Sequence, residues 1–423
     1  MPLLSQNSVF AQVTALAAQR PVHAAFAWLH GNPKTILDWQ TDLVAIPAPT
    51  HGERARAEWL AGHFRAVGLK DVEIDGAGNA IALLPSTKLP PESTGPVVLL
   101  SAHLDTVFPA GTPIHPVFDG DTLRAPGACD NAAGVAGMLA ILHALIDAQA
   151  KAQIELPVPL IFLGNVGEEG EGDLRGVRYL YQHSPLAGRI AAHIVLDGAG
   201  SDSAVTQALG SRRYDVSVTG PGGHSFSDAG TPNPIAALAA SLAAIAETPL
   251  PEEPRTTLNL GTISGGISVN SIPEGAQATI DFRSTSADQL VRLEVALHRA
   301  VEDAVERANA RARSLNGRPP GRLAFSISQI GDRPAARLPD DSQLLAALRA
   351  VDRHLSLRTD IRLGSTDANL PLSLGVPALS MGAGGEGGAA HTLHEWYSPR
   401  DREIALKRVL LLTLAMLEWA AEQ

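Results

Sequence analysis

The stretch VPLIFLGNVGEEGEG, residues 158–172, places an apolar run directly before a glycine-rich loop with two adjacent carboxylates. Short apolar runs bounded by glycine are typical of strands buried on both faces of a sheet. Further runs at 97–102 and 192–196 alternate with helical patterns at 35–45, 53–67 and 131–148. This alternation predicts an α/β domain, a sheet flanked by helices, with its cleft at the carboxyl ends of the strands.

The pattern changes near residue 212. The pattern predicts a strand at 213–219, a helix at 234–247, strands at 257–263 and 276–283, a long helix at 288–315 and a strand at 323–330. This is the β-α-β-β-α-β order of a ferredoxin-like sandwich. The α/β rhythm returns after Pro334, with a helix at 342–355, a strand at 377–381 and a terminal helix. We therefore predict a first domain made of residues 1–211 and 333–423, interrupted by an inserted α+β domain at 212–332. Residues 1–32 include a possible helix at 21–29 and are expected to pack onto the first domain.

Composition narrows the classes of function. The 423 residues carry a formal net charge of -11 without any basic stripe, which argues against nucleic acid or an anionic membrane as a partner. The single cysteine, Cys129, excludes an internal disulfide framework and suits a reducing compartment, so we expect a cytoplasmic location. The N-terminus does not resemble a secretion signal, and the apolar run at 409–417 is much shorter than the roughly 20 residues of a membrane span.

Residues able to bind metal follow the predicted strands. His103 and Asp105 come directly after the run at 97–102, and side chains two apart on a strand point to the same side. A ligating histidine commonly donates its second ring N–H to a carboxylate, so His-x-Asp supplies both a ligand and a group that orients it. The alternative is that His103 ends a strand and Asp105 begins a turn.

Four more candidates lie further along the chain. Asp130 precedes a predicted helix, where it could instead be an N-cap, Glu169 and Asp197 follow strands, and His391 follows a glycine loop. If Asp130 bridges two metal ions, each ion receives one histidine, one terminal carboxylate and one bridging oxygen. This nitrogen and oxygen set suits zinc and leaves positions open for a catalytic water.

The successive motifs resemble those of a known family. SAHLDTV (101–107), GACDN (127–131), VGEEG (166–170), LD (196–197), PGGHS (221–225) and HTLHE (391–395) occur in the order found in the dinuclear zinc exopeptidase and deacylase family. That family includes peptidase T, glutamate carboxypeptidase, acetylornithine deacetylase and succinyl-diaminopimelate desuccinylase. The resemblance runs from about residue 35 to the C-terminus.

The resemblance implies a catalytic domain with two zinc ions, for which cobalt or manganese could substitute. Asp130 would bridge the ions, often before a cis peptide, here Asp130-Asn131. His103 and Asp197 would complete one metal position, and Glu169 and His391 the other. The inserted domain resembles the family's lid, which often forms a homodimer, and its motif histidine, His224, would stabilise the oxyanion, in several members from the neighbouring subunit.

Further residues are implied to contact substrate. Asn270 and Arg283 match lid positions, and the planar guanidinium of Arg283 suits a carboxylate, although a plain salt bridge is the alternative. Backbone N–H groups of the glycine loop around Gly384 could hold a substrate carboxylate. Many relatives have a polar residue where this chain has Ala132. Aspartate rather than glutamate at 197 tilts the prediction toward cleavage of di- and tripeptides.

The predicted reaction is metal-dependent hydrolysis of an amide bond in small peptides. Glu168 would take a proton from the attacking water and return it to the leaving amine, with Asp105 orienting His103. Consecutive side chains at a strand end point in different directions, so we expect Glu169 to bind metal while Glu168 faces the water. An N-acyl-amino-acid amidohydrolase is the main alternative, and a metal-binding protein without catalysis is disfavoured by the intact Glu168. The G-x-G-x-x-G spacing at 382–387 opens no clear helix, a G-x-S-x-G elbow is absent, and Cys129 is expected to be a packing residue.

Overall fold

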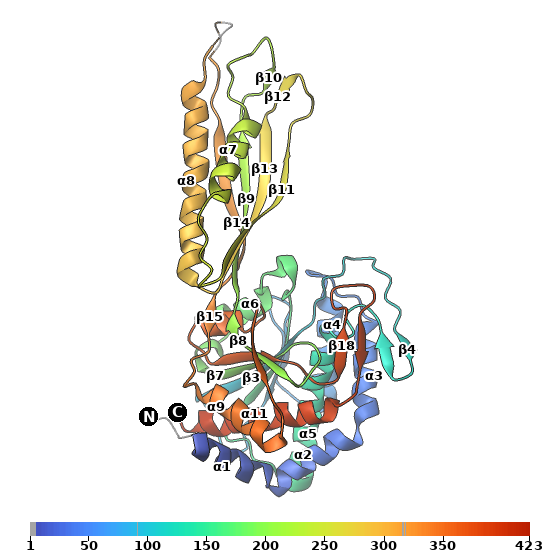
Figure 1. Ribbon diagram of the computed structural model, residues 1–423. Helices are drawn as coiled ribbons and strands as arrows, with labels where there is room; N and C mark the ends of the chain where they lie inside the picture. Colours follow the sequence, from blue (N-terminus) through green and yellow to red (C-terminus); the bar gives the residue numbers. More distant parts are fainter. Residues whose placement is uncertain (1–5, 91, 315–316, 318) are drawn as a thin grey trace. The chain divides into compact units, whose positions relative to one another are not determined.

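Figure 1 shows the computed structural model of the chain, which describes residues 6–90, 92–314, 317 and 319–423. The chain divides into two compact units. The main unit comprises Met1–Ala208 and Arg337–Gln423, and the inserted unit comprises Leu209–Ala336. The main unit is therefore built from two segments that are separated in the sequence.

In the described residues, nine strands form the sheet of the main unit, in the order β1-β2-β6-β3-β7-β17-β8-β15 with β16 paired to β8. The central strands β6, β3, β7 and β17 are parallel, whereas β1, β2 and β8 add antiparallel pairs. Every residue of β3, β6 and β17 is buried, as expected for strands covered on both faces. The predicted mixed sheet flanked by helices is confirmed. The strands are β1 (Val72–Ile74), β2 (Ala80–Leu84), β3 (Val97–His103), β6 (Leu160–Asn165), β7 (Ile190–Leu196), β8 (Ser203–Ala208), β15 (Ala336–Arg337), β16 (Asp360–Gly364) and β17 (Ala378–Met381).

Helices cover this sheet. α5 (Ala132–Ala152) and α11 (Arg402–Ala421) pack on β3 and β7. α6 (Arg175–His183) packs against Val97, Leu99 and Ile161, alternate strand residues whose side chains point to the opposite face of the sheet. α5 is long and apolar enough to cross a membrane by composition alone, but 78% of its most apolar window is buried in the protein. Its apolar character is therefore that of a central core helix.

The N-terminal segment packs on the main unit. α1 (Gln6–Ala17) contacts α9 (Gln343–Leu355) and α11, and α2 (Arg20–Gly31) contacts α5. The helix expected at 21–29 and its packing are confirmed, whereas α1 was not predicted. The remaining α-helices in the described part of this unit are α3 (Pro33–Val44), α4 (Arg54–Ala66) and α10 (Asn369–Ser373).

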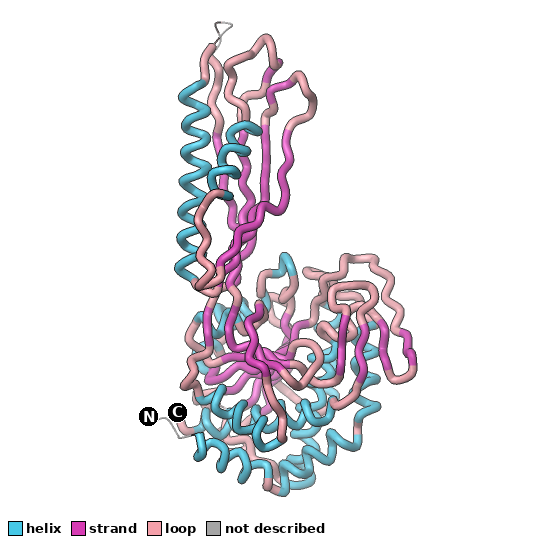
Figure 2. The backbone as a smooth tube through the Cα atoms, in the orientation of Figure 1, coloured by secondary structure: helices cyan, strands magenta, loops and turns pink. Residues whose placement is uncertain are grey.

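The inserted unit is a ferredoxin-like sandwich. β9 (Gly210–Thr219), β11 (Thr256–Gly265), β13 (Gly275–Ser284) and β14 (Ala324–Arg333) form an antiparallel sheet in the order β11-β13-β9-β14. α7 (Pro234–Ala246) and α8 (Ala287–Arg311) contact each other and this sheet (Figures 1 and 2). α8 buries an apolar stripe made of Leu290, Leu293, Leu297, Val301, Ala304 and Val305. It ends at Arg311, whereas the sequence predicted a helix to 315, a position outside the described residues.

A small sheet of the main unit was missed. β4 (Val117–Asp119), β5 (Thr122–Arg124), β18 (Glu386–Gly388) and β19 (Trp396–Ser398) pair in the order β18-β19-β5-β4. Strands of three residues are too short for an alternating pattern to reveal. This sheet holds both ends of the segment 389–395, which carries one of the predicted metal ligands.

A buried histidine makes the stability of the main unit depend on pH. His193 is fully buried in β7, with Nε2 2.7 Å from Ser101 Oγ and Nδ1 3.3 Å from the Tyr181 hydroxyl. Burial lowers the pKa of His193 to about 3. The folded chain therefore keeps His193 neutral, while in the unfolded chain it titrates near its ordinary pKa of about 6.5.

Below about pH 6.5 the unfolded chain binds a proton that folded His193 does not, so stability present at higher pH is lost as the pH falls toward 3. The loss from this group is at most about 1.4 kcal/mol per pH unit. We expect the free energy of unfolding, measured by denaturant titration, to decrease less steeply from about pH 6.5 to pH 5 in His193→Gln than in the wild type. Equal slopes in the two proteins would contradict the assignment.

Candidate active site

The five predicted metal ligands lie at one edge of the parallel strands. His103 is the last residue of β3, Asp197 follows β7, and the register pairs the ends of β3, β6, β7 and β17 side by side. Asp130 lies just before α5, Glu169 follows β6 by four residues, and His391 lies between β18 and β19. The carboxyl ends of parallel strands thus bring together residues that are far apart in the sequence.

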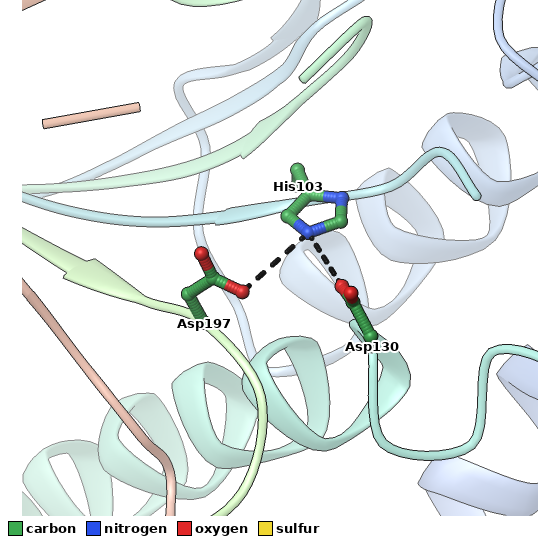
Figure 3. A group of neighbouring side chains, drawn as sticks. All are labelled: His103, Asp130 and Asp197. Atoms are coloured by element: carbon green, nitrogen blue, oxygen red, sulfur yellow. Dashed lines mark ion pairs between the residues drawn. The ribbon is translucent and has the colours of Figure 1, made fainter. Parts of the chain in front are cut away.

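Asp130 occupies the centre of this group. Its Oδ1 lies 3.0 Å from His103 Nε2, which is also 3.8 Å from Asp197 Oδ1 (Figure 3). Its Oδ2 lies 3.0 Å from His391 Nε2, and His391 Nε2 is 3.0 Å from Glu169 Oε1. The two oxygens of one carboxylate therefore face two different histidines, one on each side.

The donor set fits two metal ions. Ligand atoms of His103, Asp130 and Asp197 lie within 4.8 Å of one another, and so do those of Asp130, Glu169 and His391. Asp130 Oδ1 is buried and accepts no hydrogen bond in the described structure, although His103 Nε2 is only 3.0 Å away. A buried carboxylate oxygen normally has a partner, and a cation would supply one.

The charges in the cluster perturb one another strongly. Burial lowers the pKa of His103, but the nearby carboxylates of Asp105, Asp130 and Asp197 outweigh it and raise that pKa well above its usual value. The hydrogen bond to Asp130 raises the pKa of His391 to about 9, against the effect of burial. Burial raises the pKa of Asp130, but the two histidines outweigh it and lower that pKa. A cation bound here would compete with protons for the two imidazoles.

Glu168 and Glu169 are both buried, in a loop rather than at a strand end. β6 ends at Asn165, so the alternation of strand side chains does not separate the two carboxylates as the sequence suggested. Oxygens of both lie within 4.8 Å of each other and of His103. Burial also raises the pKa of Glu169, opposed by the charges of His103 and His391.

Asp105 positions this loop as well as His103. Its Oδ1 accepts a hydrogen bond from the Glu168 N–H at 2.9 Å, and its Oδ2 accepts one from the Glu169 N–H at 2.8 Å. His103 Nδ1 lies 3.1 Å from the backbone oxygen of Asp105 and 3.6 Å from its carboxylate. With its proton on Nδ1, neutral His103 presents the lone pair of Nε2 to the cluster. Asp105 therefore orients both His103 and the loop that carries Glu168 and Glu169.

The N-cap of α5 is Asn131, and the reading of Asp130 as the cap is wrong. Asn131 Oδ1 accepts hydrogen bonds from the N–H groups of Gly134 at 3.1 Å and Gly198 at 3.0 Å, and its Nδ2 donates to Leu196 O at 2.9 Å. These contacts bind the Asp130 loop to the segment around Asp197. The peptide bond between Asp130 and Asn131 is cis, as the family resemblance implied.

Three buried polar residues near the cluster were not assigned a role from the sequence. Glu395 accepts backbone hydrogen bonds in the loop before Asp130, Asp367 Oδ2 accepts one from Asn165 at 2.6 Å, and Arg56 donates to Leu104 O at 2.9 Å. Burial raises the pKa of Asp367 to about 7, opposed by the charge of His103. Only Glu395 had a sequence signal, because it belongs to the HTLHE motif.

The match to a family model is decisive. The model of peptidase family M20/M25/M40 matches residues 99–415, a span that includes every predicted metal ligand and the whole inserted unit. The chain belongs to this peptidase family. The resemblance inferred from the motifs is confirmed, and the chain is an enzyme for metal-dependent hydrolysis of peptide bonds.

Individual relatives of this M20 peptidase are distant. It is 28% identical over 321 residues to a probable carboxypeptidase from Aspergillus clavatus, covering 70% of this chain and 69% of the other. A solved tripeptidase from Staphylococcus aureus has a TM-score of 0.69 at 23% identity, over 93% of this chain and 99% of the other. A dinuclear metal-binding peptidase from Bacillus subtilis has a TM-score of 0.63 at 15% identity, over 92% and 99%. At these identities the two structural matches show the fold alone.

In the inserted unit of the M20 peptidase, His224 and Asn270 lie together. β10 (Gly223–His224) pairs with β12 (Ser271–Ile272), and the Ser225 N–H donates to Asn270 O at 3.0 Å. The His224 side chain is exposed, and its Nδ1 accepts from the N–H groups of Phe226 and Ser227.

The other two predicted substrate residues are engaged within the protein. Arg283 lies eight positions along β13 from Gly275, roughly 26 Å from the end near His224, and its Nε donates to Asp281 at 2.7 Å. The Gly384 N–H donates to Gly200 O at 3.1 Å, which occupies the donor that the sequence analysis assigned to a substrate carboxylate. Arg283 therefore forms a salt bridge with Asp281, and the Gly384 N–H forms a backbone hydrogen bond with Gly200.

The rival nucleophile is unsuited to catalysis. Cys129 is buried, and burial raises the pKa of its thiol to about 12. A thiol with so high a pKa supplies almost no thiolate at neutral pH. The glycine loop at 382–387 leads into β18 rather than a helix, so it lacks the context of a dinucleotide site.

Proposed function

We propose that this M20 peptidase is a dinuclear exopeptidase that cleaves short peptides, of the di- or tripeptidase or the carboxypeptidase type. One observation carries the proposal: the two oxygens of Asp130 face His103 and His391 at 3.0 Å each, with Glu168 and Glu169 beside them. The names of the reported relatives, a carboxypeptidase and a tripeptidase, support a peptide substrate. An N-acyl-amino-acid amidohydrolase is the second candidate, because the same groups can cleave either amide.

We propose zinc as the metal, with cobalt or manganese as substitutes, since the ligands are imidazole and carboxylate. His103, Asp130 and Asp197 would hold one ion, and Asp130, Glu169 and His391 the other. Bound there, the ions would lower the pKa of a water and polarise the scissile carbonyl. Glu168 then accepts the proton of the attacking water and delivers it to the leaving amine. The buried hydrogen bond from the Glu168 N–H to Asp105 Oδ1 holds the Glu168 backbone in place for both transfers.

A panel of substrates tests this function. The protein is loaded with zinc, cobalt or manganese and assayed with dipeptides, tripeptides, longer peptides blocked at one end, and N-acyl amino acids. We expect turnover of short peptides with a free terminus and little turnover of N-acyl amino acids. The reverse preference would favour the amidohydrolase, and no cleavage of any amide with two metals bound would overturn both.

We also propose that the inserted unit forms a homodimer, and that His224 acts at the active site of the neighbouring subunit. β11 is an edge strand of its sheet, and apolar side chains on it and on the following loop are 38 to 103% exposed: Leu260, Ile263, Ile267 and Val269. A long edge with exposed apolar side chains is a site for pairing with another strand.

Light scattering should give the mass of a dimer for the wild type. Ile263→Lys, which places a charge on the β11 edge, should give a monomer with lower activity. Ile361→Lys is the matched control, since Ile361 is 49% exposed on β16 of the main unit. A monomeric wild type would remove both the dimer and the role of His224 in a partner.

The cytoplasmic location stays a prediction from Cys129.

A further inference from the structure

Glu395 is bonded to the loop that ends in the bridging aspartate. Its Oε1 accepts hydrogen bonds from the N–H groups of Cys129 at 2.7 Å and Asp130 at 2.8 Å, and its Oε2 accepts one from Gly127 at 2.9 Å. The Glu395 backbone adds a fourth bond, from the Ala125 N–H to its carbonyl oxygen at 3.1 Å. The Glu395 carboxylate thus accepts hydrogen bonds from three backbone N–H groups of a single turn.

This arrangement is built inside the protein. Glu395 is fully buried, and its charge acts on the buried guanidinium of Arg56. A buried carboxylate is costly unless it accepts several hydrogen bonds, and charge-assisted bonds to backbone N–H groups are about twice as strong as neutral ones. The bonds fix the position of the Asp130 backbone and leave its carboxylate to the cluster.

Glu395 also belongs to the segment of one metal ligand. It follows His391 by four residues, and the turn between them is closed by a hydrogen bond from the Glu395 N–H to Thr392 O at 3.2 Å. Its side chain therefore joins the His391 segment to Asp130. On the other side, Asn131 joins the Asp130 loop to Leu196 and Gly198, which flank Asp197. Each metal position has its own connection to the bridging residue.

We propose that Glu395 is a positioning residue that fixes Asp130 relative to His391, and that it sets the affinity of the Asp130, Glu169 and His391 metal position specifically. The His103, Asp130 and Asp197 position is held through Asn131 and depends on Glu395 much less. The inference rests on the dinuclear centre of the proposed function. It concerns metal binding and does not require that the substrate be known.

The test is a zinc titration of metal-free protein by calorimetry, with wild type and Glu395→Gln. Glutamine has nearly the same shape, but its amide N–H₂ would oppose at least one of the three backbone N–H groups, so the turn must shift. We expect two zinc ions per wild-type chain. In the variant, one site should keep its affinity and the other should weaken roughly 10- to 100-fold, the usual effect of losing a partner of a ligand.

Asp352→Asn is the matched control. Asp352 is a buried carboxylate of the same unit that accepts hydrogen bonds from Arg408 at 2.6 Å and Thr359 at 2.6 Å. Arg408 lies in α11 and Thr359 in the loop before β16, and neither segment carries a predicted metal ligand. This variant should melt at a lower temperature than the wild type and still bind two zinc ions with unchanged affinity. If Glu395→Gln fails to fold, Glu395→Asp, which keeps the charge but is one methylene shorter, should show the same selective loss.

The outcomes separate the inference from the proposed function. Two unchanged sites in the Glu395 variant, or two sites weakened equally, would overturn the role of Glu395. A wild type that binds only one zinc ion would overturn both the inference and the dinuclear centre. Selective loss of one site, in a protein that cleaves no peptide, would support the inference and refute the peptidase assignment alone.

Discussion

Glu168→Gln should bind two metal ions and lose nearly all turnover. Glu168 is 5% exposed, its N–H is fixed by Asp105, and its carboxylate lies beside His103 and Glu169. The amide of glutamine cannot accept the proton of the attacking water, and general acid–base catalysis contributes typically 10²- to 10⁴-fold. We therefore expect kcat to fall by about that factor, with a small change in KM.

The loop offers its own control for this variant. Glu171 is exposed in the turn that follows, three residues from Glu168, and contributes to none of the groups of possible metal ligands among the described residues. Glu171→Gln should keep wild-type activity and metal content. Loss of one metal from Glu168→Gln would instead make Glu168 a ligand, in line with its proximity to His103. Activity within twofold of the wild type would remove it from the mechanism.

Asp130→Asn should lose both metal ions and all measurable activity. Asp130 belongs both to the group of His103, Asp130 and Asp197 and to the group of Asp130, Glu169 and His391. The neutral amide removes a charge from both positions, so the loss of affinity at each should exceed the roughly 10- to 100-fold effect of losing a partner outside the metal shell. Elemental analysis after dialysis measures the metal content directly.

Glu169→Gln is the comparison for the bridging role. Glu169 contacts His391 but not Asp197, so its variant should lose one ion and retain the other. Thermal unfolding gives a second readout, because a ligand at 100 times its Kd stabilises the folded state by about 2.7 kcal/mol. Zinc should raise the Tm of the wild type and of Glu169→Gln, but not that of Asp130→Asn. One tightly held ion in the Asp130 variant would rule out a bridge.

The main architecture and the grouping of the candidate metal ligands follow from local sequence patterns. Apolar runs predicted β3, β6 and β7, and parallel strands necessarily bring residues such as His103 and Asp197 to one edge. The βαββαβ order predicted the inserted sandwich. These predictions work because strand length, apolar periodicity and turn residues are properties of contiguous sequence.

The supporting contacts could not be predicted in this way. Glu395 and Gly127 are separated by 268 residues, and they meet through a small sheet of three-residue strands. The separation of Glu168 and Glu169 by strand alternation failed because β6 ends at Asn165, three residues earlier than Glu168. The two side chains are instead placed by hydrogen bonds from their backbones to Asp105, a contact between distant segments.

The insertion divides the metal centre along the chain. His103, Asp130, Glu169 and Asp197 precede the inserted unit, whereas His391 and Glu395 follow it. During synthesis, a chain that has just completed residues 209–336 holds the ligands of one metal position but only part of the other. Contacts between such distant segments form late and slowly in folding. The candidate ligands of one metal position are therefore synthesised before those of the other are complete, and catalysis must await the C-terminal segment.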